Sequence, residues 1–217
     1  VRVVSSGTGQ ALRNAKNGDA DLVLVHAKHD EEQFVIEGHG LERFDLMYND
    51  FVIVGPPDDP AGVRQAQSGA QALSRIATAR VDFVSRGDES GTHKKEIYLW
   101  ELAGWDLDKL TEQSWYMEVG AGMGATLNIA INKNAYTLTD RGTWIGFGNK
   151  IDFQILFEGD EDLFNPYGLI LVNPRIHPHI NAVEGQSLIE WLVGEEGQQL
   201  IDSYRMNGEQ LFFANAK

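Results

Sequence analysis

The chain contains no cysteine, and this absence excludes several kinds of chemistry. Its 217 residues offer no thiol for a disulfide, a thiolate metal site or a cysteine nucleophile. No apolar run approaches the roughly 20 residues that a membrane-spanning helix needs. Val1 opens directly on a strand-like pattern, without the basic and then apolar segment of a secretion signal, so we expect a mature or truncated product.

Basic residues are scarce as well. The 18 lysines and arginines face 32 acidic residues, which gives a net charge of −14. This is the wrong sign for a surface that binds nucleic acid or an anionic membrane. Phosphate-loop and hydrolase-elbow motifs are also absent, so no nucleotide-triphosphatase or serine-hydrolase reading has support. Any affinity for a small anion must therefore come from local donors.

Such donors are present at three places, where a strand-like run breaks into Gly, Ser and Thr and then enters a helical pattern. The runs and their breaks are residues 1–4 with 5–10, 81–84 with 85–92, and 115–119 with 120–126. A helix start leaves backbone N–H groups unpaired and carries about half a positive charge, which favours a bound anion. We therefore expect anion-binding helix starts at Gly9, at Thr92, and at Gly124 and Ala125.

The rest of the chain alternates strand and helix patterns. The expected strands are residues 21–25, 51–54 and 167–172, and the expected helices are 30–38 with Asp30 as its cap, 68–80, 92–103, and 187–204 with Leu188, Trp191, Leu192 and Ile201 as its buried face. Regular alternation predicts an α/β fold with mainly parallel sheets flanked by helices.

Two points where the chain changes lobe are expected from its Pro and Gly residues. Residues 55–62 read as a connection between lobes, and the chain is expected to return near Pro166. This predicts that residues 1–55 and 167–217 form lobe one, that 56–166 form lobe two, and that the anion binds in a cleft between them.

Arg86 is the only basic residue in the second break. Its guanidinium, beside Ser90, Gly91 and the helix start at Thr92, presents fork-shaped donors where an oxyanion would sit. A solvated loop arginine is the alternative. Asp88 and Glu89 are interpreted as partners of the helix dipole rather than as ligand acceptors.

Two other interpretations compete with an oxyanion site. Gly120, Gly122 and Ala125 match a dinucleotide-binding pattern with Asp140 at the expected distance, although Asp140 precedes the apolar run 143–147 instead of closing a strand. The histidine pairs, His26 with His29 and His177 with His179, lack a carboxylate at a metal-ligand spacing and are interpreted as surface or loop residues. The aromatic residues Trp100, Trp105, Trp115 and Tyr116 are interpreted as core.

Several longer segments resemble one known family. They are GTGQAL at 7–12, NGDAD at 17–21 with Val25 and His26, MYNDFVIVGP at 47–56, SRGDESGTHKK at 85–95, GMGATL at 122–127, YTLTDRG at 136–142 and FNPYG at 164–168. In this order and along nearly the whole chain, they look like the tungstate-binding proteins of bacterial ABC importers.

The resemblance implies a two-lobed periplasmic-binding-protein fold of type II that closes on one oxyanion and delivers it to a membrane permease. The ligand arginine of the family falls on Arg86 and its helix-start threonine on Thr92, while Ser6 and Thr126 occupy similar places in the first and third loops. The implied protein is a non-enzymatic, extracytoplasmic monomer without a cofactor, whose ligand is tungstate or molybdate.

The family also carries an upstream Thr-Thr-Thr-Ser segment that donates to the oxyanion, and this chain begins after it. We therefore expect the first strand and helix of lobe one to be missing. Two further hypotheses stay open at this point. One is a nucleotide-dependent enzyme built on the turn at 120–125, and the other is a degenerate homologue that has lost transport function.

Overall fold

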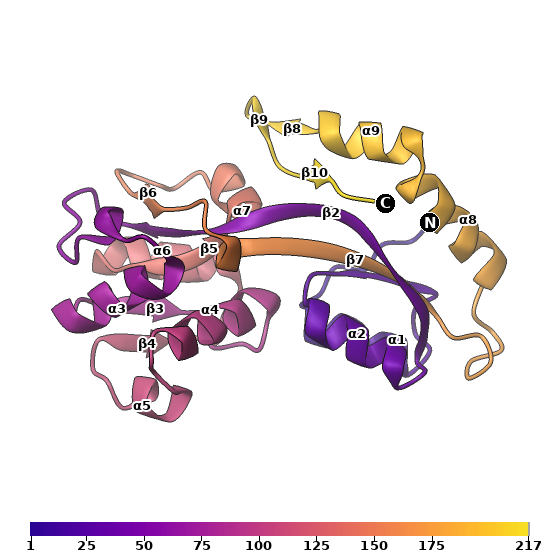
Figure 1. Ribbon diagram of the computed structural model, residues 1–217, viewed down its shortest axis with the longest axis horizontal. Helices are drawn as coiled ribbons and strands as arrows, with labels where there is room; N and C mark the ends of the chain where they lie inside the picture. Colours follow the sequence, from indigo (N-terminus) through magenta and orange to yellow (C-terminus); the bar gives the residue numbers. More distant parts are fainter. Residues whose placement is uncertain (217) are drawn as a thin grey trace. The chain divides into compact units, whose positions relative to one another are not determined.

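The computed structural model describes residues 1–216 and divides into two compact units (Figure 1). Unit 1 comprises residues 1–49 and those from 165 onward, and unit 2 comprises residues 50–164. The chain passes from unit 1 to unit 2 within strand β2 (Gly40–Gly55), and it returns at the start of β7 (Phe164–Val172). The sequence places these two boundaries at 55/56 and 166/167 instead.

The first boundary lies earlier because the end of β2 is buried on both faces in unit 2. Phe51 and Ile53 belong to one hydrophobic cluster of this unit, and Val52 and Val54 belong to another. A strand covered on both faces belongs with the elements that cover it. The Pro- and Gly-rich stretch 55–62 is therefore a connection within unit 2, and its interpretation as a crossing between lobes was wrong.

Unit 1 combines helices with a small antiparallel sheet. Its elements are α1 (Thr8–Lys16), β1 (Leu22–Val25), α2 (Lys28–Ile36), the first part of β2, most of β7, α8 (Ala182–Val193), α9 (Glu195–Ser203), β8 (Arg205–Met206), β9 (Glu209–Gln210) and β10 (Phe213–Ala214). Strand β1 pairs antiparallel with β7, and β10 pairs antiparallel with β2. Val23, Val25 and Ile170 pack with Phe34 of α2 to form the core of the unit.

Three details of unit 1 differ from the sequence-based expectation. Residues 1–4 form no strand and are exposed, because no neighbouring strand pairs with them in the described residues. Helix α2 begins at Lys28, and its N-cap is Ala27 rather than Asp30. Gly194, in an extended conformation, divides the last expected helix into α8 and α9.

The division at Gly194 also changes the buried face. A stripe predicted for one continuous helix does not stay on one side across such a break, since the helical period restarts. Ile189 is fully buried, whereas Trp191 is 43% exposed. Leu188, Leu192 and Ile201 are only partly buried.

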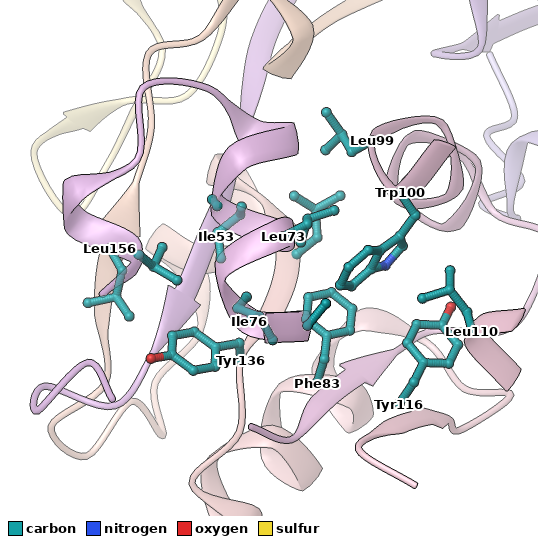
Figure 2. Close-up of a cluster of buried hydrophobic side chains, with 14 of the residues drawn as sticks. Ile53, Leu73, Ile76, Phe83, Leu99, Trp100, Leu110, Tyr116, Tyr136 and Leu156 are labelled. Atoms are coloured by element: carbon teal, nitrogen blue, oxygen red, sulfur yellow. The ribbon is translucent and has the colours of Figure 1, made fainter. Parts of the chain in front are cut away.

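Unit 2 carries the larger core. Its elements are the end of β2, the 3-10 turn η1 (Val63–Gln65), α3 (Gly69–Ala79), β3 (Phe83–Ser85), α4 (Gly91–Leu102), α5 (Leu107–Thr111), β4 (Tyr116–Glu118), α6 (Met123–Lys133), β5 (Thr137–Asp140), α7 (Arg141–Gly146), β6 (Gln154–Phe157) and η2 (Glu161–Leu163). Figure 2 shows Trp100 of α4 beside Phe83 of β3 and Tyr116 of β4. Trp115 packs against Trp100 as well, and Trp105 is partly buried against the same cluster, so these aromatic residues belong to the core, as predicted.

The sheets are mixed, and the prediction of mainly parallel sheets was wrong. Strand β2 pairs antiparallel with both β5 and β6, whereas β3 and β4 pair in parallel, as does the single bridge between Phe83 and Tyr136. A parallel pair needs a long crossover, and α4 with α5 supplies it between β3 and β4. The carboxyl ends of β3 and β4 consequently lie at the same edge.

Candidate anion-binding site

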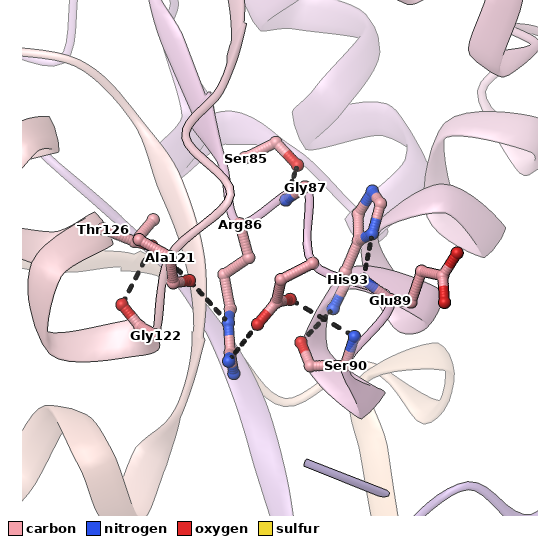
Figure 3. A network of polar contacts seen from close by, with 10 residues as sticks. Ser85, Arg86, Gly87, Glu89, Ser90, His93, Ala121, Gly122 and Thr126 are labelled. Atoms are coloured by element: carbon pink, nitrogen blue, oxygen red, sulfur yellow. Dashed lines mark hydrogen bonds and ion pairs between the residues drawn. The ribbon is translucent and has the colours of Figure 1, made fainter. Parts of the chain in front are cut away.

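The second and third breaks meet at the carboxyl edge of β3 and β4, within unit 2. The Val119 amide donates to the Ser85 carbonyl at 3.1 Å, and the Ala121 amide donates to the Arg86 carbonyl at 3.2 Å. These bonds hold the loop before α4 against the loop before α6, and Figure 3 shows the Arg86 side chain reaching from the first loop to Ala121 in the second. Two helix starts and one arginine are therefore brought together by neighbouring parallel strands, which is where ligands bind in open α/β sheets.

Arg86 is fixed between these two loops and is only 17% exposed. Its Nε donates to the Ala121 carbonyl at 3.4 Å, and its Nη2 donates to Asp88 Oδ2 at 2.5 Å. Within residues 1–216 no acceptor lies in reach of the other guanidinium N–H groups. Part of the donor fork is therefore free for a ligand.

Asp88 balances the charge of Arg86 and shapes the start of α4. Partial burial raises the pKa of this carboxyl, but hydrogen bonds from Ser90 and the charge of Arg86 outweigh that effect and hold the pKa below its usual value. Its Oδ1 accepts from the Ser90 amide at 3.2 Å. Both carboxylate oxygens thus have a partner in the protein, as the interpretation of Asp88 as a partner of the helix start requires.

Ser90 is the N-cap of α4, and its Oγ accepts from the His93 amide at 3.3 Å. Ser90, Gly91 and Thr92 are all buried. In the described part of the chain, the amides of Gly91 and Thr92 and the hydroxyl of Thr92 have no hydrogen-bond acceptor. Unpaired amides are expected at a helix start, so these groups are donors that an anion can use.

The start of α6 is built differently. Gly122 is the N-cap, and its carbonyl accepts from the amides of Ala125 and Thr126 at 3.0 and 3.1 Å. The Thr126 hydroxyl, in a fully buried side chain, lies 3.2 Å from the same carbonyl. The donor groups of Ala125 and Thr126 therefore bind the Gly122 carbonyl within the turn. The amides of Met123 and Gly124 remain available for an anion.

The remaining two predicted site residues lie in unit 1. Ser6 is exposed and precedes α1, whose N-cap is Gly7 without a side-chain cap. Gly9 lies in the first turn of α1, so the helix start predicted for the first break is present. The structure thus gathers the seven predicted residues of unit 2 at one edge and places Ser6 and Gly9 at another helix start.

Sequence reasoning missed a buried carboxyl behind this edge. Glu96 of α4 is 2% exposed, and its Oε1 accepts from the Tyr116 hydroxyl at 2.8 Å and from Trp100 Nε1 at 3.2 Å. Burial raises its pKa to about 7, and the hydrogen bonds only partly offset this effect. The available signal was its spacing, because Thr92, Glu96 and Leu99 share one face of a helix.

Sequence reasoning also missed His93, which is buried in the first turn of α4. Burial lowers its pKa, so the ring is neutral near pH 7. Its Nδ1 accepts from the Glu89 amide at 3.1 Å, which assigns the proton to Nε2. The ring therefore adds no positive charge to the site.

The competing interpretations find no support in the structure. Asp140 is the last residue of β5, contrary to the expectation. Its carboxylate caps α7 by accepting from the Thr143 amide at 2.8 Å. It is therefore not free to accept a hydrogen bond from the hydroxyl group of a ribose. His177 and His179 each contact a main-chain carbonyl, and His26 stacks on Tyr167.

The described residues form neither a cluster of metal ligands nor a helix that could span a membrane. Residues 1–216 hold no group of three or more His, Cys, Asp or Glu side chains placed to bind a metal ion. Among the same residues, no helix has the length and apolar character to cross a membrane.

Known proteins similar to this chain identify its family. Residues 1–196 match the family model described as a PBP superfamily domain. Across its whole length the chain is 44% identical to the tungstate-binding protein TupA of Peptoclostridium acidaminophilum and covers 76% of that protein. It is 47% identical to a Haloferax volcanii protein whose name proposes anion binding for an ABC transporter, and it spans 64% of that protein's length.

The solved structure of the tungstate-binding protein TupA from Desulfovibrio alaskensis G20 also matches. It superposes with a TM-score of 0.87 at 42% sequence identity, over all of this chain and 87% of that one. The α/β fold of the periplasmic-binding-protein type, which the sequence predicts, is confirmed by these matches.

Proposed function

The chain belongs to the PBP superfamily and, within it, to the family of the TupA tungstate-binding proteins, and we propose from this membership that it binds tungstate for an ABC importer. The observation that carries the proposal is the meeting of Arg86 with the starts of α4 and α6 at one edge of unit 2. Molybdate, an anion of the same shape and charge, is the close competitor. The nucleotide-dependent enzyme is not favoured.

The chemistry of this edge suits a fully deprotonated tetrahedral dianion. Such an anion needs donors only, and neutral N–H and O–H groups with one arginine supply them. Phosphate usually keeps a proton near neutral pH and wants a carboxylate acceptor. Asp88, the carboxylate in contact with Arg86, already has a partner for each oxygen. The site therefore selects against a ligand that must donate a proton.

The proposed role is capture and delivery. The relatives are named as binding proteins, so we propose that this chain performs no reaction and needs no cofactor, the anion being its cargo. It would act outside the cytoplasm as a monomer and hand the anion to the membrane permease of an ABC transporter.

A calorimetric titration of the purified chain with tungstate, molybdate, sulfate, phosphate and NAD tests the proposal. We expect binding of tungstate and molybdate, weaker or no binding of sulfate and phosphate, and none of NAD. Binding of NAD with no response to either metal oxyanion would overturn the transport proposal in favour of the nucleotide-dependent alternative. No response to any ligand would favour the degenerate homologue.

A further inference from the structure

Glu96 is an unusual residue for its position. It lies among the aromatic side chains of the unit 2 core, and no lysine or arginine contacts it in the described part of the chain. A buried carboxyl without a cation costs stability compared with an apolar side chain of similar size. A residue kept at such a cost suggests a purpose beyond packing.

The hydrogen bonds of Glu96 lead directly to the anion site. Besides Tyr116 and Trp100, the side chain of Ser85, the last residue of β3, interacts with this carboxyl and lowers its pKa. Ser85 is fully buried, and its Oγ accepts from the Gly87 amide at 3.2 Å (Figure 3). Because that Oγ is already an acceptor, its own proton faces the hydrogen-bonded pair of Glu96 and Tyr116, and the Ser85 side chain lowers the pKa of both groups. The carboxyl thereby fixes the orientation of the Ser85 hydroxyl.

The Gly87 amide lies in a turn whose backbone conformation must be held in place. Gly87 has a φ of +57°, in the left-handed region, and a Cβ at this position would lie 2.7 Å from the Glu118 Cβ. Glu89 has a positive φ of 58° as well. Arg86 therefore begins a turn with two left-handed residues, and the hydrogen bond from the Gly87 amide to Ser85 holds the first of them.

We propose that Glu96 is a positioning residue for the anion site, which acts on Arg86 through the Ser85 hydroxyl and the Gly87 amide. The proposal rests on the proposed function, since it concerns the affinity for the same oxyanion. It differs from a packing role in one respect: a positioning residue loses its effect on affinity once Arg86 is removed.

A double-mutant cycle measures this difference. Tungstate affinity is determined by calorimetry for the wild type, Glu96→Gln, Arg86→Ala and the double variant. Glutamine keeps the shape of the side chain and an acceptor for Tyr116 and Trp100, but it no longer offers Ser85 a carboxylate oxygen. We expect Glu96→Gln to weaken binding about tenfold or more in the wild type and less than twofold in Arg86→Ala.

Trp100→Phe is the matched control. It removes the other donor to Glu96 Oε1 without touching Ser85, so we expect a loss of thermal stability and an affinity within about twofold of the wild type. Equal losses of affinity from Glu96→Gln in both Arg86 backgrounds would overturn the positioning role and leave Glu96 as a packing residue.

A second readout needs no ligand. In NMR spectra of the free protein, Glu96→Gln should shift the Gly87 amide and the Arg86 Nε–H resonances, whereas Trp100→Phe should leave them in place. Unchanged resonances in Glu96→Gln would contradict the proposal. Shifted resonances in a chain whose wild type binds no oxyanion would support the positioning role and contradict the proposed function alone.

Discussion

At the scale of single residues, the site depends on how Arg86 is held. Its contacts with Ala121 and Asp88 leave part of the guanidinium free and keep the side chain mostly out of water. A charge-assisted hydrogen bond gains strength in such a place, because less water competes for the donor.

Replacing Arg86 by alanine should therefore weaken tungstate binding strongly. Losing a charge-assisted bond to a desolvated dianion costs on the order of 2 kcal/mol or more, which is roughly a thirtyfold loss of affinity. Arg86→Lys should restore only part of it, since the planar fork is lost. Arg64→Ala is the control, because Arg64 is exposed and bonds to Pro57 and Gln154 elsewhere in unit 2. Equal losses in the two alanine variants, measured by calorimetry, would remove Arg86 from the site.

Glu96 should make stability depend on pH. The pKa of Glu96 is about 7 in the folded chain and 4.5 as a free side chain. Between pH 4.5 and 7 the folded state therefore holds a proton on this carboxyl that the unfolded state has lost. The contribution is fully present below pH 4.5 and is lost as pH rises through 7. The free energy of unfolding should fall by roughly 3 kcal/mol more in the wild type than in Glu96→Gln over this interval.

Chemical denaturation at pH 4.5, 6 and 8 measures this difference. Glu112→Gln, at an exposed position of unit 2, serves as the control and should keep the pH dependence of the wild type. A Glu96→Gln variant with the same pH dependence as the wild type would mean that Glu96 stays ionised throughout.

At the scale of helices and strands, the sequence predicts starts better than pairings. The helix predicted from the Ser68 cap does begin there, with Ser68 Oγ accepting from the Gln71 amide, and the helix predicted from Thr92 begins one residue earlier, with Ser90 as its cap. Both signals are local, so four residues suffice to detect them. The antiparallel pairing of β2 with β5 joins distant segments and leaves no such local signal. The same limit hid Glu96 of α4, whose hydrogen-bond partner Tyr116 comes from strand β4.

Adding one methyl group at Gly124 tests whether the start of α6 belongs to the anion site. Gly124 is exposed, has no strained backbone angle, and has open space around the position of a Cβ. Gly124→Ala should therefore raise stability by up to about 1 kcal/mol through helix propensity. It should also weaken tungstate binding, because the methyl group crowds the amides that receive the anion. Thermal unfolding and calorimetry measure the two effects.

Gly148→Ala is the matched control, since Gly148 also has open space around it and lies outside the predicted site. It should leave the affinity unchanged. A Gly124→Ala variant with wild-type affinity would exclude the start of α6 from the site.

At the scale of the whole molecule, the sequence predicts two units but misplaces their boundaries. Pro and Gly residues after β2 suggested a crossing, whereas the chain changes unit inside the strand, between Asn49 and Asp50. The crossing has no turn signal, because neither Gly nor Pro lies between Gly40 and Gly55 and the strand runs through without a break. The seven site residues predicted in unit 2 do converge, since they follow two strands that end at the same edge.

The net charge of −14 belongs to this scale too. It repels an anion at long range, so the local donors must supply the whole affinity. The central claim is therefore a claim about place: the anion binds at the starts of α4 and α6, beside Arg86.

The most direct test of that claim is an amide NMR titration of the full chain with tungstate. The account predicts that the largest shifts occur at the amides of Gly91, Thr92, Met123 and Gly124 and at Arg86 Nε–H, and that they saturate together. Saturable binding with these resonances unmoved would contradict the account, because the anion would then be held by other donors of the chain.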